Sequence, residues 1–219
     1  MGDSSPIFDL PRLLICEGPE DIAFFHKLIE AHGLPTFHVR STGLNRHEAG
    51  GNSKFGERLK AIRTNRGFQK LQHIVLVSDN DNDHDSSFQN ICDQVDAASF
   101  QRPHRELERT ATVPSIMIMM LPLGKEKGAL ENVCAEVAKR ADGTAAAHVD
   151  KLIDDMHGRK WSVSRRGKAW LRCNLAVRCA HDPFVLLGAA FRERRTQNLI
   201  PIGDTQFFAP IARILATYA

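Results

Sequence analysis

Two short apolar runs, each followed at once by acidic residues, constrain the fold of this chain more than any other feature. The runs are Leu13–Ile15 and Ile74–Val77, and the acidic residues after them are Glu17, Glu20, Asp21, Asp79, Asp81 and Asp83. Runs of this length are typical of buried strands in a parallel sheet. Because the ends of such strands meet at one sheet edge, their carboxylates repel one another unless water or a cation neutralises them. We therefore expect a divalent, oxygen-liganded metal ion at this edge.

Strand and helix patterns alternate over the first half of the chain. Residues 11–16, 37–41, 73–78 and 115–121 are predicted as strands, and apolar residues at helical spacing follow the first three of them. Alternation of this kind gives a parallel sheet with right-handed crossovers. The predicted fold class is α/β and Rossmann-like, with a central parallel sheet of about four strands flanked by helices.

The character of the sequence changes beyond Gly124. Apolar residues recur at helical spacing from Leu130 and again from Val149, and no further strand pattern follows. We expect an α/β domain over residues 1–140 and a helical C-terminal extension, 141–219, packed on it. The polar stretch from Arg102 to Thr112 is predicted to be a surface connection.

Composition bounds the class of protein. A formal net charge of +3 is too small to establish a nucleic-acid partner by itself. The five cysteines form neither a CxxC pair nor a zinc-ligand spacing, and their odd number argues against a disulfide framework. A reducing compartment fits this pattern. The longest apolar run, Ile116 to Leu123, is far shorter than a membrane span. We expect a cytoplasmic protein with no membrane partner.

The acidic residues also fit roles that need no such metal edge. Carboxylates in a first helical turn complement the helix dipole by roughly 0.3 to 1 kcal/mol each, which accounts for Glu20 as well as a metal does. The aspartates of the second segment have the spacing of an EF-hand loop, but His84 stands where that loop needs glycine and Asn90 where it needs glutamate. A phosphatase motif of the DxDx(T/V) kind fails because Asp83 stands in place of Thr or Val. A strand-end Asp-x-Asp opposite a strand-end glutamate remains.

The segments LLICEGPED and IVLVSDNDND, with a strand and a helix between them, resemble a TOPRIM domain. This metal-binding fold is shared by topoisomerases, bacterial primases, a ribosomal RNA maturase and the OLD-type nucleases. The core of the resemblance covers roughly residues 10 to 140. Weaker likeness extends to GGNSKFGERL, LPLGKEKGALENV and RGKAWLRCNLAVRCAHDPFVLLGAAF, which are similar to an uncharacterised stand-alone TOPRIM-like family related to the OLD-type nucleases.

The resemblance implies a role for each acidic position. It makes Glu17 a general acid or base that also touches metal, and Asp79 and Asp81 ligands of Mg²⁺ or Mn²⁺. Similarity to the OLD-type nucleases adds three further metal-ligand candidates, Asp21, Asp83 and Glu131. Two ions about 3.5 to 4 Å apart stabilise both the attacking and the leaving oxygen of a phosphodiester. An ordinary glutamate on a helix face explains Glu131 equally well.

Several relatives within that fold are excluded by what this chain lacks. The Asp-x-Asp-x-x-Gly-Glu extension of topoisomerases is missing, and the single tyrosine is Tyr218. The cysteine pairs of a primase zinc module are missing as well. No GxxxxGK(S/T) phosphate loop occurs, because Gly50 to Lys54 lacks the spacing. Nucleotide hydrolysis would therefore require a separately encoded ATPase or another protein partner.

Basic residues cluster after the fourth strand and in the C-terminal part. The candidates for nucleic-acid phosphate contacts are Lys125, Lys127, Arg165, Arg166 and Lys168. Trp161 and Trp170 lie in the same stretch and suit base stacking, although two core tryptophans on a helix with a solvated basic face explain the pattern as well. We expect one of Lys125, Lys127 and Lys168 to stabilise charge on a cleaved phosphate, and the sequence does not choose among them; Lys168 is our candidate for the catalytic lysine.

These inferences define a hypothesis with two rivals. The hypothesis is a Mg²⁺- or Mn²⁺-dependent nuclease, a phosphodiesterase that cuts DNA or RNA with metal-activated water. The first rival is a non-catalytic, metal-stabilised module that binds a partner protein or nucleic acid. The second is a nucleotidyl-transfer enzyme, which uses the same metals and needs a nucleoside triphosphate. The oligomeric state and the choice of substrate are left open by the sequence.

Overall fold

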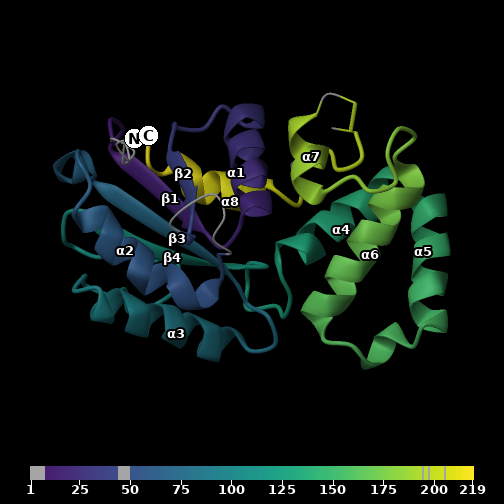
Figure 1. Cartoon of the computed structure of the whole chain (residues 1–219), viewed down its shortest axis with the longest axis horizontal. Coiled ribbons are helices and arrows are strands. Elements are labelled where there is room, and N and C mark those ends of the chain that lie inside the picture. The colour runs from purple at the N-terminus through teal and green to yellow at the C-terminus, as the bar shows by residue number, and fades with distance from the viewer. Residues whose placement is uncertain (1–7, 44–49, 194, 197, 205) are drawn as a thin grey trace, which may run out of the picture.

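The computed structural model describes residues 8–43, 50–193, 195, 196, 198–204 and 206–219. Over these residues the chain forms a four-stranded parallel sheet in the order β2-β1-β3-β4, with helices on both faces (Figure 1). The strands are β1 (Arg12–Cys16), β2 (His38–Ser41), β3 (His73–Asp79) and β4 (Ser115–Leu121). The predicted α/β class is confirmed, and each strand begins and ends within one residue of its predicted bounds.

The helices divide into those that cross over between strands and those that follow the sheet. The crossover helices are α1 (Pro19–Ala31), α2 (Phe55–Arg63) and α3 (His84–Ala97). The later helices are α4 (Leu130–Ala141), α5 (Gly143–Asp155), α6 (Val163–Arg178), α7 (Leu187–Arg192) and α8 (Ala209–Ala216). Short 3₁₀ turns are η1 (Asn52–Lys54), η2 (Phe68–Lys70) and η3 (Gly158–Lys160).

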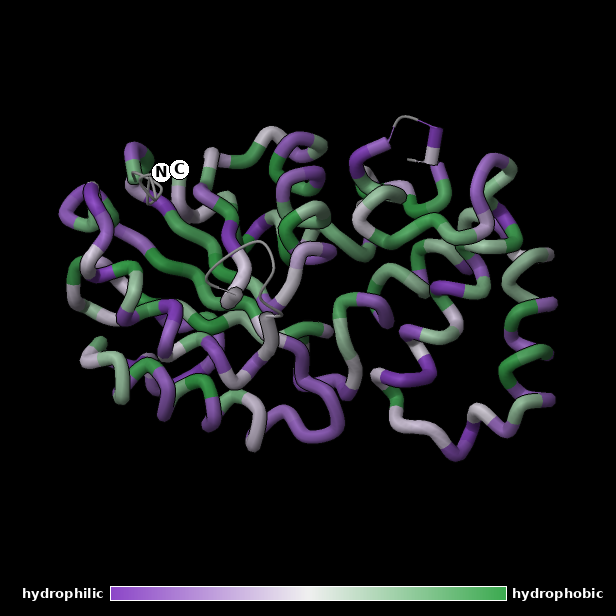
Figure 2. The backbone as a smooth tube through the Cα atoms, viewed as in Figure 1, coloured by the Kyte–Doolittle hydropathy of each residue, from purple (hydrophilic) through white to green (hydrophobic). Residues whose placement is uncertain are grey.

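Successive strand residues are buried on opposite faces of the sheet, which explains why the strands are apolar throughout. Ile74 and Leu76 pack with α2 and α3, whereas Val75 and Val77 pack with α1 and the later helices. The strands accordingly form the most continuous hydrophobic stretches in Figure 2. By the same alternation Asp79 belongs to the face of Val75 and Val77, so its carboxylate is directed toward α1 and α4.

The sheet and the helical C-terminal part share one apolar core. The larger buried cluster runs from Leu14 in β1 through Trp170 in α6 to Leu215 in α8. Tyr218 follows α8, and its hydroxyl donates a hydrogen bond to the Met117 sulfur at 3.4 Å. The backbone carbonyl of Tyr218 accepts a hydrogen bond from the Arg12 guanidinium. The last helix is thereby fixed to the amino-terminal end of the strands. The division at residue 140 remains a prediction, because both predicted parts contribute to this core.

The polar segment before β4 is more than a surface connection. Leu107 N donates to Ile118 O at 2.9 Å, and Thr110 N donates to Ile116 O at 3.0 Å. A Glu106 carboxylate oxygen accepts from Met120 N at 3.1 Å. These contacts satisfy backbone groups on the outer edge of β4, which would otherwise be open to pairing with another strand. Among the helices of the described residues, none has the length and apolar character needed to cross a membrane.

Candidate functional site

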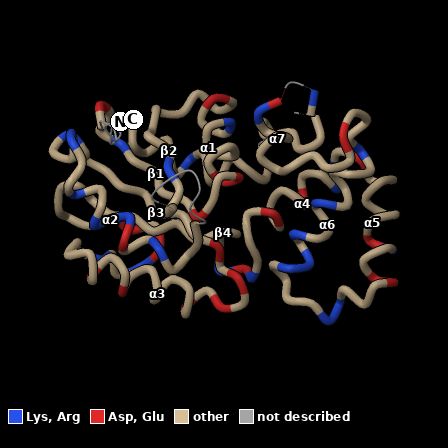
Figure 3. The backbone as a smooth tube through the Cα atoms, viewed as in Figure 1, with Lys and Arg blue, Asp and Glu red and all other residues tan. Residues whose placement is uncertain are grey.

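Four carboxylates gather at the carboxyl edge of the sheet, and we call them the acidic cluster: Glu17, Asp21, Asp79 and Glu131. Glu17 follows β1, Asp21 and Glu131 lie in the first turns of α1 and α4, and Asp79 ends β3. Oε1 of Glu17 accepts from Ser78 Oγ at 2.6 Å and from Asp79 N at 3.0 Å, so this carboxylate links two strand ends. Acidic positions accordingly gather where the sheet meets α4, with basic positions on α6 opposite (Figure 3).

Burial and mutual repulsion perturb the acidic cluster. Burial raises the pKa of Asp79 well above its ordinary value, and the charges of Glu17, Asp21 and Glu131 raise it further. Burial also raises the pKa of Asp21 to about 7, with contributions from Glu17 and Glu131, despite the lowering effect of its bond to Gly18. The pKa of Glu131 is raised by burial despite the nearby Lys168. Several carboxylates therefore share a space that cannot hold all their charges without a cation.

Helix starts hold two of these carboxylates in place. Oδ2 of Asp21 accepts from Gly18 N at 2.7 Å, which closes the first turn of α1. Oδ1 of Asp79 accepts a hydrogen bond at 2.9 Å from the backbone N of Leu130, the first residue of α4. Both contacts place negative charge at the positive end of a helix dipole, which stabilises it in part. Asp21 therefore has a structural role at the helix start, and the same contact fixes its side chain in the cluster.

The loop before η1 positions Glu17 from behind. A Cβ on Gly50 would lie 1.8 Å from the Glu17 carbonyl oxygen, so only glycine permits this approach. Thr42 Oγ1 donates to that carbonyl at 3.1 Å and accepts from Gly51 N at 2.8 Å. Sequence reasoning did not assign these residues to the site. Their one signal was the glycine pair itself, which marks close backbone approach as readily as a turn.

Lys168 in α6 is the basic side chain that contacts the acidic cluster. Its Nζ lies 3.7 Å from Asp79 Oδ2, with 40% of the lysine side chain and 15% of the aspartate side chain exposed. Burial lowers the pKa of Lys168, but Glu131, Asp79 and Asp81 together raise it more, so its pKa is above the ordinary value. The lysine is therefore a stable cation at neutral pH. The structure thus places Lys168 beside Asp79, and its catalytic role stays a prediction.

Close packing of α6 on α4 sets this position. A Cβ on Gly167 would lie 2.4 Å from Asn132 Nδ2, so α6 approaches α4 where it carries glycine. The same Asn132 amide donates to Val163 O at 3.2 Å, and its oxygen accepts from Ala129 N at 2.9 Å. Asn132 is thus a supporting residue that sequence reasoning missed. An asparagine in a helix start gives little signal of a long-range role.

Next to the acidic cluster lies a hollow between α6 and the turn after β3, with a volume of about 410 Å³. Asp81 reaches its rim with φ of +50°, and its backbone pairs with Gly128 through bonds of 2.7 and 2.9 Å. We call the hollow between α6 and the turn after β3 the basic hollow. Its lining residues are Asp81, Asn82, Ser162, Ser164, Arg165, Lys168, Ala169 and Arg172. The predicted ligand Asp81 therefore lines a hollow together with cations of α6.

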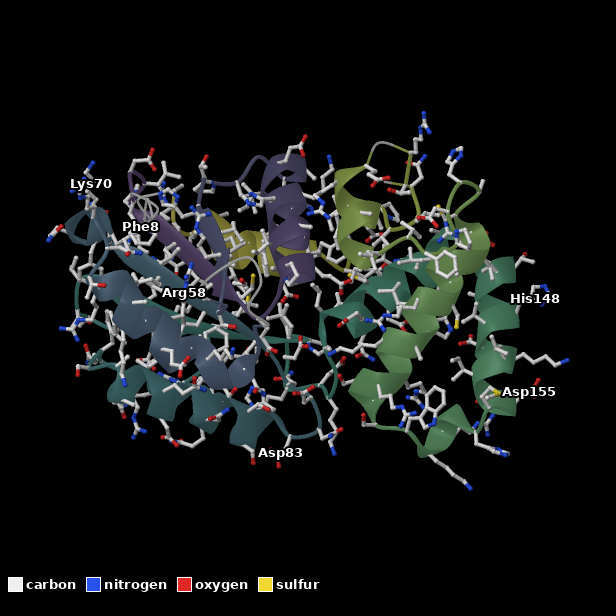
Figure 4. All side chains as sticks on the ribbon, in the orientation of Figure 1. Phe8, Arg58, Lys70, Asp83, His148 and Asp155 are labelled. Atoms are coloured by element: carbon white, nitrogen blue, oxygen red, sulfur yellow. The ribbon has the colours of Figure 1, made fainter. Side chains whose placement is uncertain are left out.

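Other predicted site residues have different surroundings. Asp83 is exposed and caps the start of α3, with Oδ1 accepting from Ser86 N at 3.1 Å; it lies at the lower edge of the view in Figure 4. Lys125 pairs with Asp85 at 3.0 Å on an exposed loop. Lys127 and Arg166 line a separate hollow with Phe207, on another side of α6. The structure therefore brings none of these four into the acidic cluster or the basic hollow.

The tryptophans serve the core rather than an open stacking surface. Trp170 is 4% exposed, and its Nε1 donates to Asp150 Oδ1 at 2.7 Å. Trp161 packs against the core cluster, and the Arg165 guanidinium lies 4.8 Å from its ring centre. Of the two roles considered for these residues, the core role is correct for Trp170.

His84, the first residue of α3, is buried. Its Nδ1 lies 2.8 Å from Asp85 Oδ1 and its Nε2 lies 2.9 Å from Glu106 Oε2. The ring stacks on Phe88, with 6.3 Å between ring centres. The histidine ties the start of α3 to the segment that covers the edge of β4. It is a structural link beside the site.

The donor chemistry of the acidic cluster fits a divalent metal ion. The donors are hard carboxylate oxygens, which suit Mg²⁺ or Mn²⁺, and their mutual repulsion is the electrostatic condition that a divalent cation relieves. Over the residues that the structure describes, no three His, Cys, Asp or Glu side chains already have metal-ligand spacing. The charge and the ligand type therefore fit such an ion, and the side chains must move closer together to hold it.

Fold and site together define an α/β protein with an acidic site at the carboxyl edge of a parallel sheet. The chain belongs to the family described as "Protein of unknown function (DUF3226)", whose model matches residues 11–193. The matched segment contains the sheet, the acidic cluster and the basic hollow. Neither a curated protein nor a solved structure matches the chain significantly.

Proposed function

We propose that this protein is a metal-dependent phosphodiesterase of TOPRIM type that hydrolyses DNA or RNA. The observation that carries the proposal is the acidic cluster, in which Asp79 is buried next to Glu17, Asp21 and Glu131, so that burial and these three charges raise its pKa. Helix capping accounts for single carboxylates such as Asp21, but it gives no reason to gather four of them together with only partial compensation by Lys168. Perturbed carboxylates beside a hollow are typical of functional sites.

In this proposal Asp79, Glu17, Asp21 and Glu131 hold Mg²⁺ or Mn²⁺, with Asp81 at the rim. A bound divalent ion of this kind activates water and neutralises charge on the phosphoryl oxygens. Glu17, held by Ser78 and by the backbone of Asp79, moves the proton of the attacking water. Lys168 stabilises negative charge on the cleaved phosphate, because its raised pKa keeps it cationic.

The proposal includes its setting in the cell. All five cysteines are free thiols, which fits a reducing cytoplasm. Nucleic acid is the proposed partner, and a separately encoded ATPase is the protein partner proposed for any step that needs nucleotide hydrolysis.

A nuclease assay tests the activity. The purified protein is incubated with Mg²⁺ or Mn²⁺ and with single-stranded, duplex and structured DNA and RNA, alongside the Glu17→Gln and Asp79→Asn variants. We expect cleavage by the wild type and a loss of about 10² to 10³ in rate for each variant. Absence of cleavage on every substrate, or equal cleavage by Asp79→Asn, would refute the proposal.

One observation favours the non-catalytic alternative. Because Lys168 already lies 3.7 Å from Asp79, part of the cluster is neutralised without any metal. A binding module of this kind would show stabilisation by the metal without turnover. Thermal unfolding with and without Mn²⁺, run beside the nuclease assay, separates the two functions.

A further inference from the structure

The basic hollow is built from one face of α6. Arg165, Lys168 and Arg172 are spaced by three and four residues, so they project from the same side of the helix. Arg166 projects about 100° away from Arg165 and lines a different hollow. The sequence showed only a basic stretch. The structure divides that stretch into a face that borders the acidic cluster and a face that does not.

The cations of this face are poised for an external anion. In the described part of the chain, neither Arg165 nor Arg172 forms an ion pair with a carboxylate, and Lys168 forms one with Asp79. The charges of Glu131 and Asp81 also act on Lys168, and the charge of Arg172 acts on Glu131. The ring of Trp161 holds the Arg165 guanidinium, which reduces the conformational freedom that binding must remove. Ser162 and Ser164 add hydroxyl groups to the same lining. Guanidinium, ammonium and hydroxyl groups together are the donors that bind phosphate oxygens.

The size of the hollow selects among phosphate ligands. The seven residue-to-residue steps from Arg165 to Arg172 span about 10 Å along the helix, the rise of about three nucleotides of one strand. A volume of about 410 Å³ is at the small end of the range for ligand pockets, which fits a short segment of one strand. A single strand can bend into such a hollow, whereas duplex DNA is stiff, with a persistence length of about 50 nm, and does not.

We propose that the basic hollow binds consecutive phosphates of a single nucleic-acid strand and delivers that strand to the acidic cluster. The delivery of the strand for cleavage rests on the proposed nuclease function, but strand binding is measurable without cleavage. Lys168 lies at the junction, where it contacts Asp79 on one side and lines the hollow on the other. The strand therefore passes from Arg165 and Arg172 toward Asp79.

Binding is measured by fluorescence anisotropy on the full chain in EDTA, which removes turnover. The probes are a short labelled oligothymidylate, the matching oligoribouridylate and a duplex of the same length. We expect the single strands to bind at least tenfold more tightly than the duplex, and Arg165→Ala and Arg172→Ala each to weaken single-strand binding about tenfold. Each substitution should also lower the slope of log K against log salt by about 0.7, because one phosphate contact is lost.

Two variants control the measurement. Lys151→Ala removes an exposed cation of α5 that lines no part of the hollow, and it should leave the dissociation constant unchanged. Arg166→Ala also removes an arginine, at the next position of α6, but this arginine lines a different hollow. This variant should therefore weaken binding less than Arg165→Ala does. Circular dichroism and thermal unfolding establish that each variant is folded.

The outcomes separate this inference from the nuclease proposal. Equal or tighter duplex binding, or no effect of Arg165→Ala and Arg172→Ala, overturns the single-strand inference even if the protein cuts nucleic acid. Single-strand binding that depends on both arginines supports it even if no substrate is cut, and in that case only the nuclease proposal fails. Asp79→Asn should retain strand binding while it abolishes cleavage.

Discussion

The ammonium nitrogen of Lys168 lies 3.7 Å from Oδ2 of Asp79, where helix α6 meets the end of strand β3. This cation moderates the repulsion among the carboxylates of the acidic cluster, since its charge lowers the pKa of both Asp79 and Glu131 in part. In the proposed function the same side chain contacts the phosphate. The acidic cluster is thus partly balanced by a half-exposed lysine.

Replacing Lys168 by Met should separate metal binding from catalysis. The substitution removes a positive charge that repels a divalent ion, so Mn²⁺ affinity measured by calorimetry should rise by about 0.5 to 1 kcal/mol. Cleavage should fall by about 10² to 10³, because charge on the phosphate loses its partner. A rise in cleavage, or loss of Mn²⁺ binding, would contradict both roles assigned to this lysine.

Replacing Asp79 by Asn should stabilise the metal-free protein. Asparagine keeps an oxygen that accepts a hydrogen bond from Leu130 N. It also removes the carboxyl group of Asp79, whose pKa is raised by burial and by the charges of three neighbouring carboxylates. In EDTA the free energy of unfolding should increase by about 1 kcal/mol. The stabilisation by Mn²⁺ should disappear at the same time, as urea unfolding with and without the ion will show.

Asp142→Asn is the matched control for that change. Asp142 also accepts a bond from a backbone amide, Ala145 N at 2.9 Å, but at the start of α5. The Asp142→Asn substitution should leave the stabilisation by Mn²⁺ intact. If both variants lose that stabilisation equally, the metal does not bind at Asp79.

The stability of the metal-free protein should fall as pH rises from 5 to 8. Burial raises the folded-state pKa of Asp21 from 3.8 to about 7. Between these values the folded protein keeps a proton that the unfolded chain has lost, so the free energy of unfolding decreases with pH and levels off above about 7. Between pH 5 and 8 the loss in the free energy of unfolding attributable to Asp21 is roughly 2.5 kcal/mol.

Urea unfolding in EDTA at several pH values, compared between wild type and Asp21→Asn, isolates this effect. The variant keeps an oxygen for Gly18 N and should show a flatter profile. Excess Mn²⁺ should flatten the wild-type profile too, because the ion takes the place of the proton. Parallel profiles for the two proteins would show that Asp21 is not the titrating group.

Gly167→Ala should misplace Lys168. The added Cβ would lie 2.4 Å from the Asn132 amide, which is held by hydrogen bonds at both ends, so α6 must move away from α4. We expect a loss of about 1 to 3 kcal/mol in stability, together with reduced cleavage. Gly143→Ala is the control, because nothing lies within 4 Å of its Cβ. That substitution should be neutral or stabilise α5 by up to about 1 kcal/mol.

His84→Ala should loosen the segment that covers the edge of β4. The change leaves Glu106 without its partner at 2.9 Å and removes a ring that stacks on Phe88. We expect a loss of about 1 to 3 kcal/mol and faster hydrogen exchange at the Met120 amide, which bonds to Glu106. The exposed His104 serves as control, and His104→Ala should change neither quantity. Unchanged exchange at Met120 in His84→Ala would refute the link.

The sheet was predictable because burial on both faces leaves a plain pattern in the sequence. Strands such as β4 are apolar at nearly every position, and a short polar or glycine-rich segment ends each of them. Parallel strands then place Glu17 and Asp79 at one edge with no further information. The fold class, the strand bounds and the meeting of these two residues follow from local sequence alone.

The surroundings of the second acidic segment were not predictable from local sequence. Spacing alone treats Asp79, Asp81 and Asp83 alike, yet each has a different role in the structure. Asp79 faces α4, Asp81 turns toward α6 because its positive φ and its pairing with Gly128 redirect it, and Asp83 caps α3. Which partner a carboxylate meets is decided by the backbone of its turn and by segments distant in the chain.

The sequence by itself determined the strands, their burial on both faces and the gathering of acidic groups at their ends, because these depend on the residue pattern within single segments. Only the tertiary structure decided that Lys168 borders that site, that Glu131 belongs to it and that Arg165 and Arg166 face different ways. The reason is that α6 docks on α4 through the contact of Gly167 with Asn132. Long-range packing of this kind leaves no periodic trace in the sequence.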